Sequence, residues 1–148
     1  MQDRIEQSIE INAPVERVWR ALTDHNEFGE WFRANLDGPF KVGEVTRGQI
    51  TYPGYEHLEW VAIIKKMEHE RLFAFAWCPG SRDSDLDPST EPQTLVEFKL
   101  EATRDGTRLL ISESGFSALP SDRRADAFRE NSNGWEEQAK NIAAYVET

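Results

Sequence analysis

The chain has 148 residues, a formal net charge of −10 and one cysteine, and these values exclude several classes of protein. The length is that of one ordinary domain, and one cysteine excludes both an internal disulfide and a multi-cysteine zinc site. With 27 acidic against 17 basic residues, the chain repels phosphate groups, so we expect neither nucleic acid nor an anionic membrane as a partner. No apolar run resembles a signal peptide or reaches the roughly 20 residues of a membrane span, which predicts a cytoplasmic protein without membrane insertion.

The first 32 residues predict one strand and two short helices. Apolar and polar residues alternate over 4–11, which is typical of a strand. A helix is expected after Pro14, because proline suits the first helical turn and apolar residues then recur at helical spacing, namely Val15, Val18, Trp19 and Leu22. A second short helix is predicted around 26–32, where three aromatic residues occur.

The middle of the chain predicts a run of strands. Alternating apolar residues indicate strands over 44–52, 56–67, 72–77, 94–103 and 107–116. Asp105-Gly106, between the last two, is a strong signal for a two-residue hairpin turn. Because these strands follow one another without intervening helices, they favour an antiparallel meander.

The segment 79–92 is acidic and lacks apolar content. Its three aspartates at alternate positions suggest a calcium loop, but the EF-hand pattern fails. That pattern needs glycine at its sixth position and an acid at its twelfth, where Pro88 and Thr94 stand. We expect an acidic loop between two strands, able to gate a nearby opening.

The chain after Pro120 predicts one long helix. Residues three or four apart form a single stripe on it, namely Ala125, Phe128, Ser132, Trp135, Ala139, Ile142 and Val146. About 26 residues at 1.5 Å each span roughly 39 Å, enough to cross a small sheet. Gly134 stands in mid-helix, where glycine costs about 1 kcal/mol relative to alanine. We expect its missing side chain to let a strand or short helix approach the backbone closely beside Trp135.

Five strings in the sequence resemble those of one known family: IEINAPVERVWRALTD (9–24), WF (31–32), FAFAW (73–77), GTRLLISESGF (106–116) and NGWEEQAKNIAAYV (133–146). In this order they resemble the START-like (SRPBCC) superfamily, and within it the AHSA-like family, homologues of the C-terminal domain of the heat-shock-protein ATPase activator. The resemblance covers essentially the whole chain, so we expect a single domain over 1–148. It implies an α+β helix-grip fold, in which a curved antiparallel sheet wraps around one long C-terminal helix and two short helices follow the first strand.

The resemblance also implies a cavity between the sheet and the long helix. Carried over position by position, the family pattern places eight apolar side chains around it: Trp19, Trp31, Phe75, Trp77, Phe98, Phe128, Trp135 and Ile142. Large rigid rings of this kind frame binding sites for apolar molecules. Two polar residues, Tyr52 and Glu113, would set the ligand's orientation. Alternatively, Glu113 pairs with an arginine or reaches water at the end of its strand.

Three functions are consistent with these features. The preferred interpretation is a binding protein for an apolar or aromatic small molecule, such as a lipid, a polyketide or an aromatic metabolite. The second is a protein–protein module akin to the chaperone-activating domain, and the third is a cyclase- or hydrolase-type enzyme in which Glu113 transfers protons. The preferred interpretation needs no catalytic residue, cofactor or metal. The sequence is compatible with a homodimer, but no sequence element decides between a monomer and a dimer.

Motifs for other chemistry are missing from the sequence. There is no GxSxG, GxGxxG or Walker motif, which argues against the usual nucleophile elbow and nucleotide sites. The three histidines, His25, His57 and His69, lack the spacing that would place two metal ligands on one face.

Overall fold

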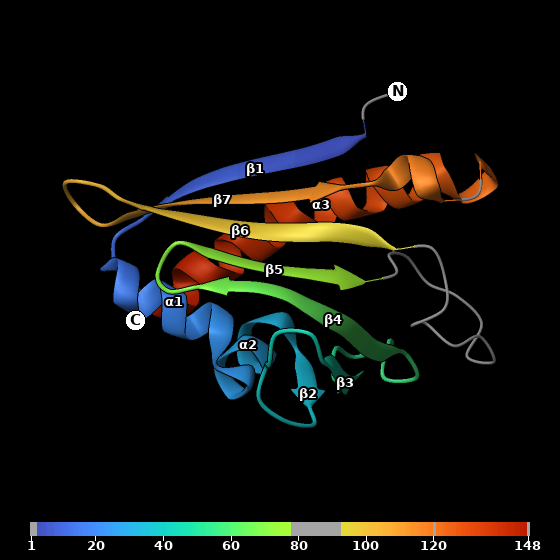
Figure 1. Cartoon of the computed structure of the whole chain (residues 1–148), viewed down its shortest axis with the longest axis horizontal. Coiled ribbons are helices and arrows are strands. Elements are labelled where there is room, and N and C mark those ends of the chain that lie inside the picture. Colours follow the sequence, from blue (N-terminus) through green and yellow to red (C-terminus); the bar gives the residue numbers. More distant parts are fainter. Residues whose placement is uncertain (1–2, 78–92, 120, 148) are drawn as a thin grey trace.

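A curved antiparallel sheet with one long helix across its inner face dominates the structure (Figure 1). The structure is a computed structural model that describes residues 3–77, 93–119 and 121–147, apart from the side chains of residues 122 and 123. Its strands are β1 (Arg4–Ile11), β2 (Ala34–Leu36), β3 (Val45–Ile50), β4 (Glu59–Glu68), β5 (Leu72–Trp77), β6 (Thr94–Ala102) and β7 (Thr107–Ser114). Its helices are α1 (Val15–Thr23), α2 (His25–Phe32) and α3 (Ser121–Val146), with the 3-10 turn η2 over Phe116–Ala118.

The described strands form one sheet in the order β1-β7-β6-β5-β4-β3-β2. Every neighbouring pair is antiparallel. Strands β2 to β7 follow the chain as a meander, and the last of them, β7, pairs with β1 at the far edge. The helix-grip α+β fold is therefore confirmed, with α1 and α2 inserted after the first strand (Figure 1).

The predicted elements agree with the structure except at strand ends and at one short strand. Strand β2 was not predicted, because its three residues are too few for alternation to show. Strands β3 and β4 are separated by a wider turn than the sequence indicates, since β3 ends at Ile50 and β4 begins at Glu59. The predicted gating loop 79–92 lies outside the described residues.

Aromatic rings fill the space between the sheet and α2. Phe75 and Phe98 point inward from β5 and β6, and both are fully buried. The ring centroid of Phe75 lies 6.2 Å from that of Phe28 on α2 and 6.0 Å from that of Phe98. A fully buried phenylalanine stabilises a fold by roughly 1.5–3 kcal/mol, so this cluster holds α2 against the sheet. Packed aromatic rings therefore occupy the space between the sheet and α2.

The apolar stripe of α3 is confirmed for its second half, where the buried residues are Trp135, Ala139, Ile142 and Val146. The first half differs, because Ala125 is exposed and Ala127 is buried instead. Phe128 is half-buried and packs against Phe116 of η2, with ring centroids 5.2 Å apart. The first turns of α3 therefore pack partly on η2. Within the described ranges, no helix has both the length and the apolar content needed to cross a bilayer.

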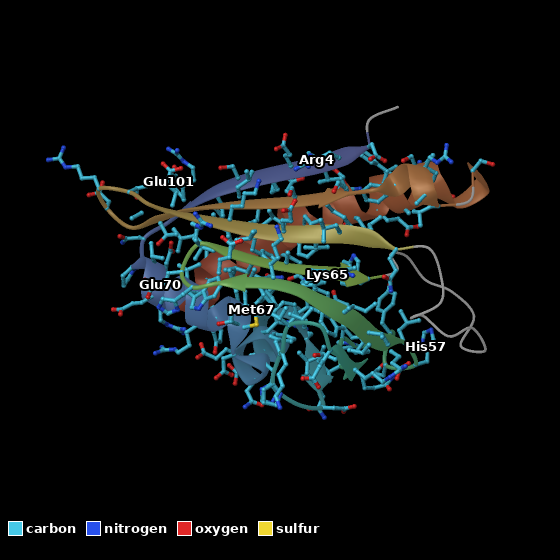
Figure 2. The ribbon with its side chains drawn as sticks, in the orientation of Figure 1. Arg4, His57, Lys65, Met67, Glu70 and Glu101 are labelled. Carbon is cyan, nitrogen blue, oxygen red and sulfur yellow. The ribbon has the colours of Figure 1, made fainter. Side chains whose placement is uncertain are left out.

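The face of the sheet turned away from α3 is mixed, because it carries charged residues but also, in its middle, buried apolar residues such as Val61, Ala74 and Ala76. Arg4 on β1, Lys65 on β4 and Glu101 on β6 are exposed there (Figure 2). Each of them is next in sequence to a buried apolar residue that faces the core. At these three positions the alternation is that of an antiparallel sheet with one covered and one solvated face, whereas the four central residues of β5 are buried on both faces.

Candidate ligand-binding cleft

A cleft of about 470 Å³ opens between the C-terminal end of α2 and the middle of α3. Small-molecule sites usually measure roughly 300–1,000 Å³. Of the described residues, those that line it are Trp31, Phe32, Arg33, Tyr52, Trp77, Asn131, Gly134, Trp135, Glu137, Gln138 and Asn141. Helix α2 and its C-cap supply the first three, the turn after β3 and the end of β5 supply one each, and α3 supplies the rest. Segments far apart in sequence therefore meet in this cleft.

Four aromatic side chains form the apolar part of the cleft. The rings of Trp77 and Trp135 lie 5.7 Å apart at 31° to each other. Phe32 meets Trp77 edge to face at 5.9 Å, and it meets Trp31 in the same way at 5.7 Å. Trp31 and Trp135 are almost fully buried, whereas Phe32 and Trp77 are half-buried. The last two therefore offer ring surface to a ligand.

Behind this wall lies the buried carboxyl group of Glu113. Its Oε1 accepts hydrogen bonds from Trp135 Nε1 at 2.8 Å and from Asn131 Nδ2 at 2.9 Å. Its Oε2 accepts from Trp77 Nε1 at 2.8 Å, from Asn131 Nδ2 at 3.1 Å and from the hydroxyl group of Thr94. An ionised carboxylate accepts but does not donate, so it matches this set of donors. Glu113 thus connects β5, β6 and β7 to α3.

The arrangement around Glu113 follows from the sheet register. Trp77 pairs with Thr94 across β5 and β6, and Val96 pairs with Glu113 across β6 and β7. Because residues two apart point to the same face of a strand, Trp77, Thr94 and Glu113 all face α3. Asn131 and Trp135 lie four residues apart on α3, and both donate hydrogen bonds to the same carboxyl group from the helix side.

Glu113 has neither of the alternative environments that the sequence suggests. Its side chain is 0% exposed, so it does not reach water at the end of its strand. Among the ion pairs between described side chains, none involves Glu113, so no arginine pairing is observed. Hydrogen bonds to a charged group are roughly twice as strong as neutral ones, and here four neutral donor groups replace a counter-ion. Glu113 therefore positions the two indoles from behind the cleft wall.

The third tryptophan of the cleft is also held by an internal hydrogen bond. Trp31 Nε1 donates to the main-chain oxygen of Ala21 in α1 at 2.9 Å. The indole N–H groups of all three lining tryptophans thus donate hydrogen bonds to protein acceptors. A ligand would meet their ring faces and edges and would find no free indole donor.

Polar side chains form the rim of the cleft. Arg33 is the C-cap of α2 with a left-handed backbone (φ 68°), and its guanidinium carbon lies 5.2 Å from the centroid of the Tyr52 ring. On α3, Asn141 Nδ2 donates to Gln138 Oε1 at 3.0 Å. Glu137 pairs with Lys140 at 3.8 Å. The rim therefore combines one cation, one acid that has its own counter-ion, and several amides.

The structure brings four of the ten predicted ligand-binding residues together at the cleft, namely Trp31, Tyr52, Trp77 and Trp135. Phe75 and Phe98 lie directly behind them, with ring centroids 5.3 Å from Trp77 and 5.7 Å from Trp135. Glu113 lies behind the same wall. Trp19, Phe128 and Ile142 do not line the cleft, and Trp19 instead meets the ring of His69 at 6.0 Å.

Sequence reasoning missed most of the polar rim. Asn131, Gly134, Gln138 and Asn141 follow one another at intervals of three or four residues and line the cleft. That spacing marks one row on the helix beside the apolar stripe, so the pattern was present in the sequence. Arg33 gave no such signal, because its position depends on the left-handed backbone that ends α2.

The interpretation of Gly134 as a site of close backbone approach is wrong. Apart from its chain neighbours and the backbone of its own helix, a Cβ atom at this position would meet no atom within 4 Å, and the residue is exposed. Gly134 lines the cleft, so its missing side chain leaves space there that a larger residue would occupy.

Comparison with known proteins agrees with the fold. A protein from Mesorhizobium loti, MLL2253, has a TM-score of 0.76 at 22% identity, covering 97% of this chain and 96% of that one. A protein from Arthrobacter aurescens has the same TM-score at 21% identity, covering 97% of this chain and 86% of that one. DynU16, a protein in the dynemicin biosynthetic locus, has a TM-score of 0.75 at 22% identity, covering all of this chain but 48% of that one. At these identities the likeness shows the fold alone.

The family comparison covers nearly the whole chain. None of the curated proteins matches the sequence. The model of the family described as activator of Hsp90 ATPase homolog 1-like protein matches residues 12–147. These residues include every helix and strand except β1. The chain therefore belongs to the activator of Hsp90 ATPase homolog 1-like family.

Proposed function

We propose that this protein binds an apolar, aromatic small molecule in the cleft between α2 and α3. The observation that carries the proposal is the pair of rings Trp77 and Trp135, which meet at the cleft and are both hydrogen-bonded to Glu113. Lipids with a ring system, polyketides and aromatic metabolites are the ligand classes that fit such a wall.

The geometry supports binding because the aromatic wall is organised in advance. A side chain that is already ordered loses little conformational entropy when a ligand binds, and Trp31, Trp77 and Trp135 are each held by a hydrogen bond. A stacked or edge-to-face aromatic pair contributes about 0.5–1.5 kcal/mol beyond the area it buries. A flat ligand in contact with Phe32 and Trp77 would make several such contacts.

A variant that fills the cleft tests the proposal. Gly134→Leu places a side chain into open space at the cleft and replaces glycine by a better helix former, so we expect a stable protein with a blocked site. Gly134→Ala is the matched control, because it makes the same backbone change with almost no added volume. Binding of naphthalene-2-carboxamide is measured by calorimetry and by the indole N–H resonances of the protein.

The expected result is binding to the wild type and to Gly134→Ala, with at least a tenfold loss (about 1.4 kcal/mol) in Gly134→Leu. Equal binding to both variants would place the ligand elsewhere. If neither naphthalene-2-carboxamide nor naphthalene-2-carboxylate binds to the wild type, the proposal fails.

A cochaperone-like protein–protein module is the second candidate, favoured by the family's description as Hsp90 ATPase activators. Stimulation of a chaperone ATPase at equal stoichiometry, unchanged by Gly134→Leu, would support it. An enzymatic role for Glu113 gains nothing from the geometry, because both of its oxygens accept from protein donors and the group is fully buried. A cytoplasmic location and a homodimer belong to the same proposal, and cell fractionation and analytical ultracentrifugation test them.

A further inference from the structure

Arg33 is the one cationic residue among the described residues that line the cleft. No ion pair between described side chains involves it. This is unexpected in a chain with 27 acidic and 17 basic residues, where several other arginines, such as Arg17 and Arg108, do pair with glutamates. The rim of the cleft therefore carries a positive charge that the described side chains do not neutralise.

Two features hold the Arg33 side chain at this place. Its backbone ends α2 in the left-handed region and donates its N–H to the oxygen of Gly29 at 2.8 Å. Its guanidinium group lies over the ring of Tyr52, which also lines the cleft. A guanidinium that stacks on a ring keeps the N–H groups in its own plane free, and these match the two oxygens of a carboxylate.

Most of the other polar groups of the cleft that could bind or repel an anion are already engaged. The three indole N–H groups donate hydrogen bonds to acceptors within the protein, and the side-chain amide of Asn131 donates to Glu113. Glu137, which would repel an anion, has Lys140 as its partner. The strongest hydrogen-bond donor that remains for a ligand is therefore Arg33.

We propose that the ligand is a planar aromatic acid, whose ring lies against Trp77 and Phe32 and whose carboxylate pairs with Arg33. This inference rests on the proposed function and adds to it the charge of the ligand and the residue that selects for it. A neutral aromatic compound would use the same apolar wall but leave the guanidinium group without a partner.

The test compares two probes that differ in charge and hardly in shape, naphthalene-2-carboxylate and naphthalene-2-carboxamide. Calorimetry at neutral pH and low salt gives the affinity of each for the wild type, Arg33→Gln and Arg4→Gln. Glutamine tolerates the left-handed backbone about as well as arginine does, since both are unbranched at Cβ. Arg4 lies exposed on the outer face of β1, so its variant has the same charge change away from the cleft (Figure 2).

We expect the wild type and Arg4→Gln to bind the carboxylate about fivefold more tightly than the amide, a preference that weakens as salt rises. Arg33→Gln should lose the preference and keep its affinity for the amide. Equal affinities in the wild type, or a preference that survives in Arg33→Gln, would overturn the inference while leaving the proposed function intact. If neither probe binds the wild type, both fail together.

Discussion

Glu113 offers the sharpest perturbation of the cleft wall, because one carboxyl group orients two of its tryptophans. Glu113→Gln keeps the size of the side chain and replaces one acceptor oxygen by an amide donor. If the amide nitrogen takes the place of Oε1, Trp135 Nε1 loses its acceptor; if it takes the place of Oε2, Trp77 Nε1 does. In either orientation one indole N–H faces another N–H.

The loss of stability expected in Glu113→Gln follows from the hydrogen bonds that the substitution changes. A buried donor left without a partner costs about 1–3 kcal/mol. The remaining hydrogen bonds also change from charged to neutral acceptors, which removes a further 0.5–1.5 kcal/mol or so for each one that weakens. The neutral amide offsets part of this loss, because it no longer requires a buried charge. We expect the free energy of unfolding to fall by about 2–4 kcal/mol.

Equilibrium denaturation in urea measures this change, and Glu6→Gln is the control. Glu6 is exposed on β1. Its variant makes the same glutamate-to-glutamine change, with the same change in net charge, but should alter the free energy of unfolding by less than about 0.5 kcal/mol. The indole N–H resonances of Trp77 and Trp135 should also move in Glu113→Gln, while that of Trp31 stays. A loss as small as the control's, with unmoved resonances, would refute the role given to Glu113.

Three further predictions concern other parts of the molecule. Gly134→Ala should raise the free energy of unfolding by about 0.5–1 kcal/mol in urea denaturation, because the added methyl group meets open space in a helix. Burial, and after it hydrogen bonding to Glu30, raises the pKa of Tyr145 to about 12. The stability that the protonated Tyr145 contributes is therefore complete below about pH 10 and is lost as the pH rises toward 12. Tyr145→Phe should remove the last step of an ultraviolet tyrosinate titration. Hydrogen bonding from the backbone of Ser117 lowers the pKa of Asp3. The difference in stability between the wild type and Asp3→Ala should therefore be complete above about pH 4. It should vanish as the pH falls through the lowered pKa.

Each of these has a clear contrary outcome. A destabilised Gly134→Ala would mean that something does approach the helix at that point. A titration of the Tyr145→Phe variant that keeps its highest step would assign that step to another tyrosine. A stability difference for Asp3→Ala that grows as the solution is acidified would reverse the sign expected for a lowered pKa.

Local periodicity explains which parts of the fold could be predicted. Alternation along β7 was enough to predict that Glu113 faces inward, and it is fully buried. The stripe containing Trp135 and Ile142 was enough to predict which face of α3 covers the sheet. The three residues of β2 carried no such signal, because they make less than two periods of a strand.

The cleft was less predictable because it depends on contacts between distant segments. Glu113 finds its partners 18 to 36 residues away along the chain, and no local pattern indicates that two indoles would share one carboxyl group. Arg33 reaches the rim only because α2 ends in a left-handed residue. The sequence around Gly134 indicates packing, because a glycine within a helix more often marks a close neighbour than an open cleft.

Binding in the cleft is tested most directly by titrating the isotope-labelled protein with naphthalene-2-carboxylate and following the indole N–H resonances of its five tryptophans. We expect the resonances of Trp31, Trp77 and Trp135 to shift together with one dissociation constant, while that of Trp19, which does not line the cleft, stays in place. Unmoved resonances for all three cleft tryptophans at saturating ligand would contradict binding between α2 and α3.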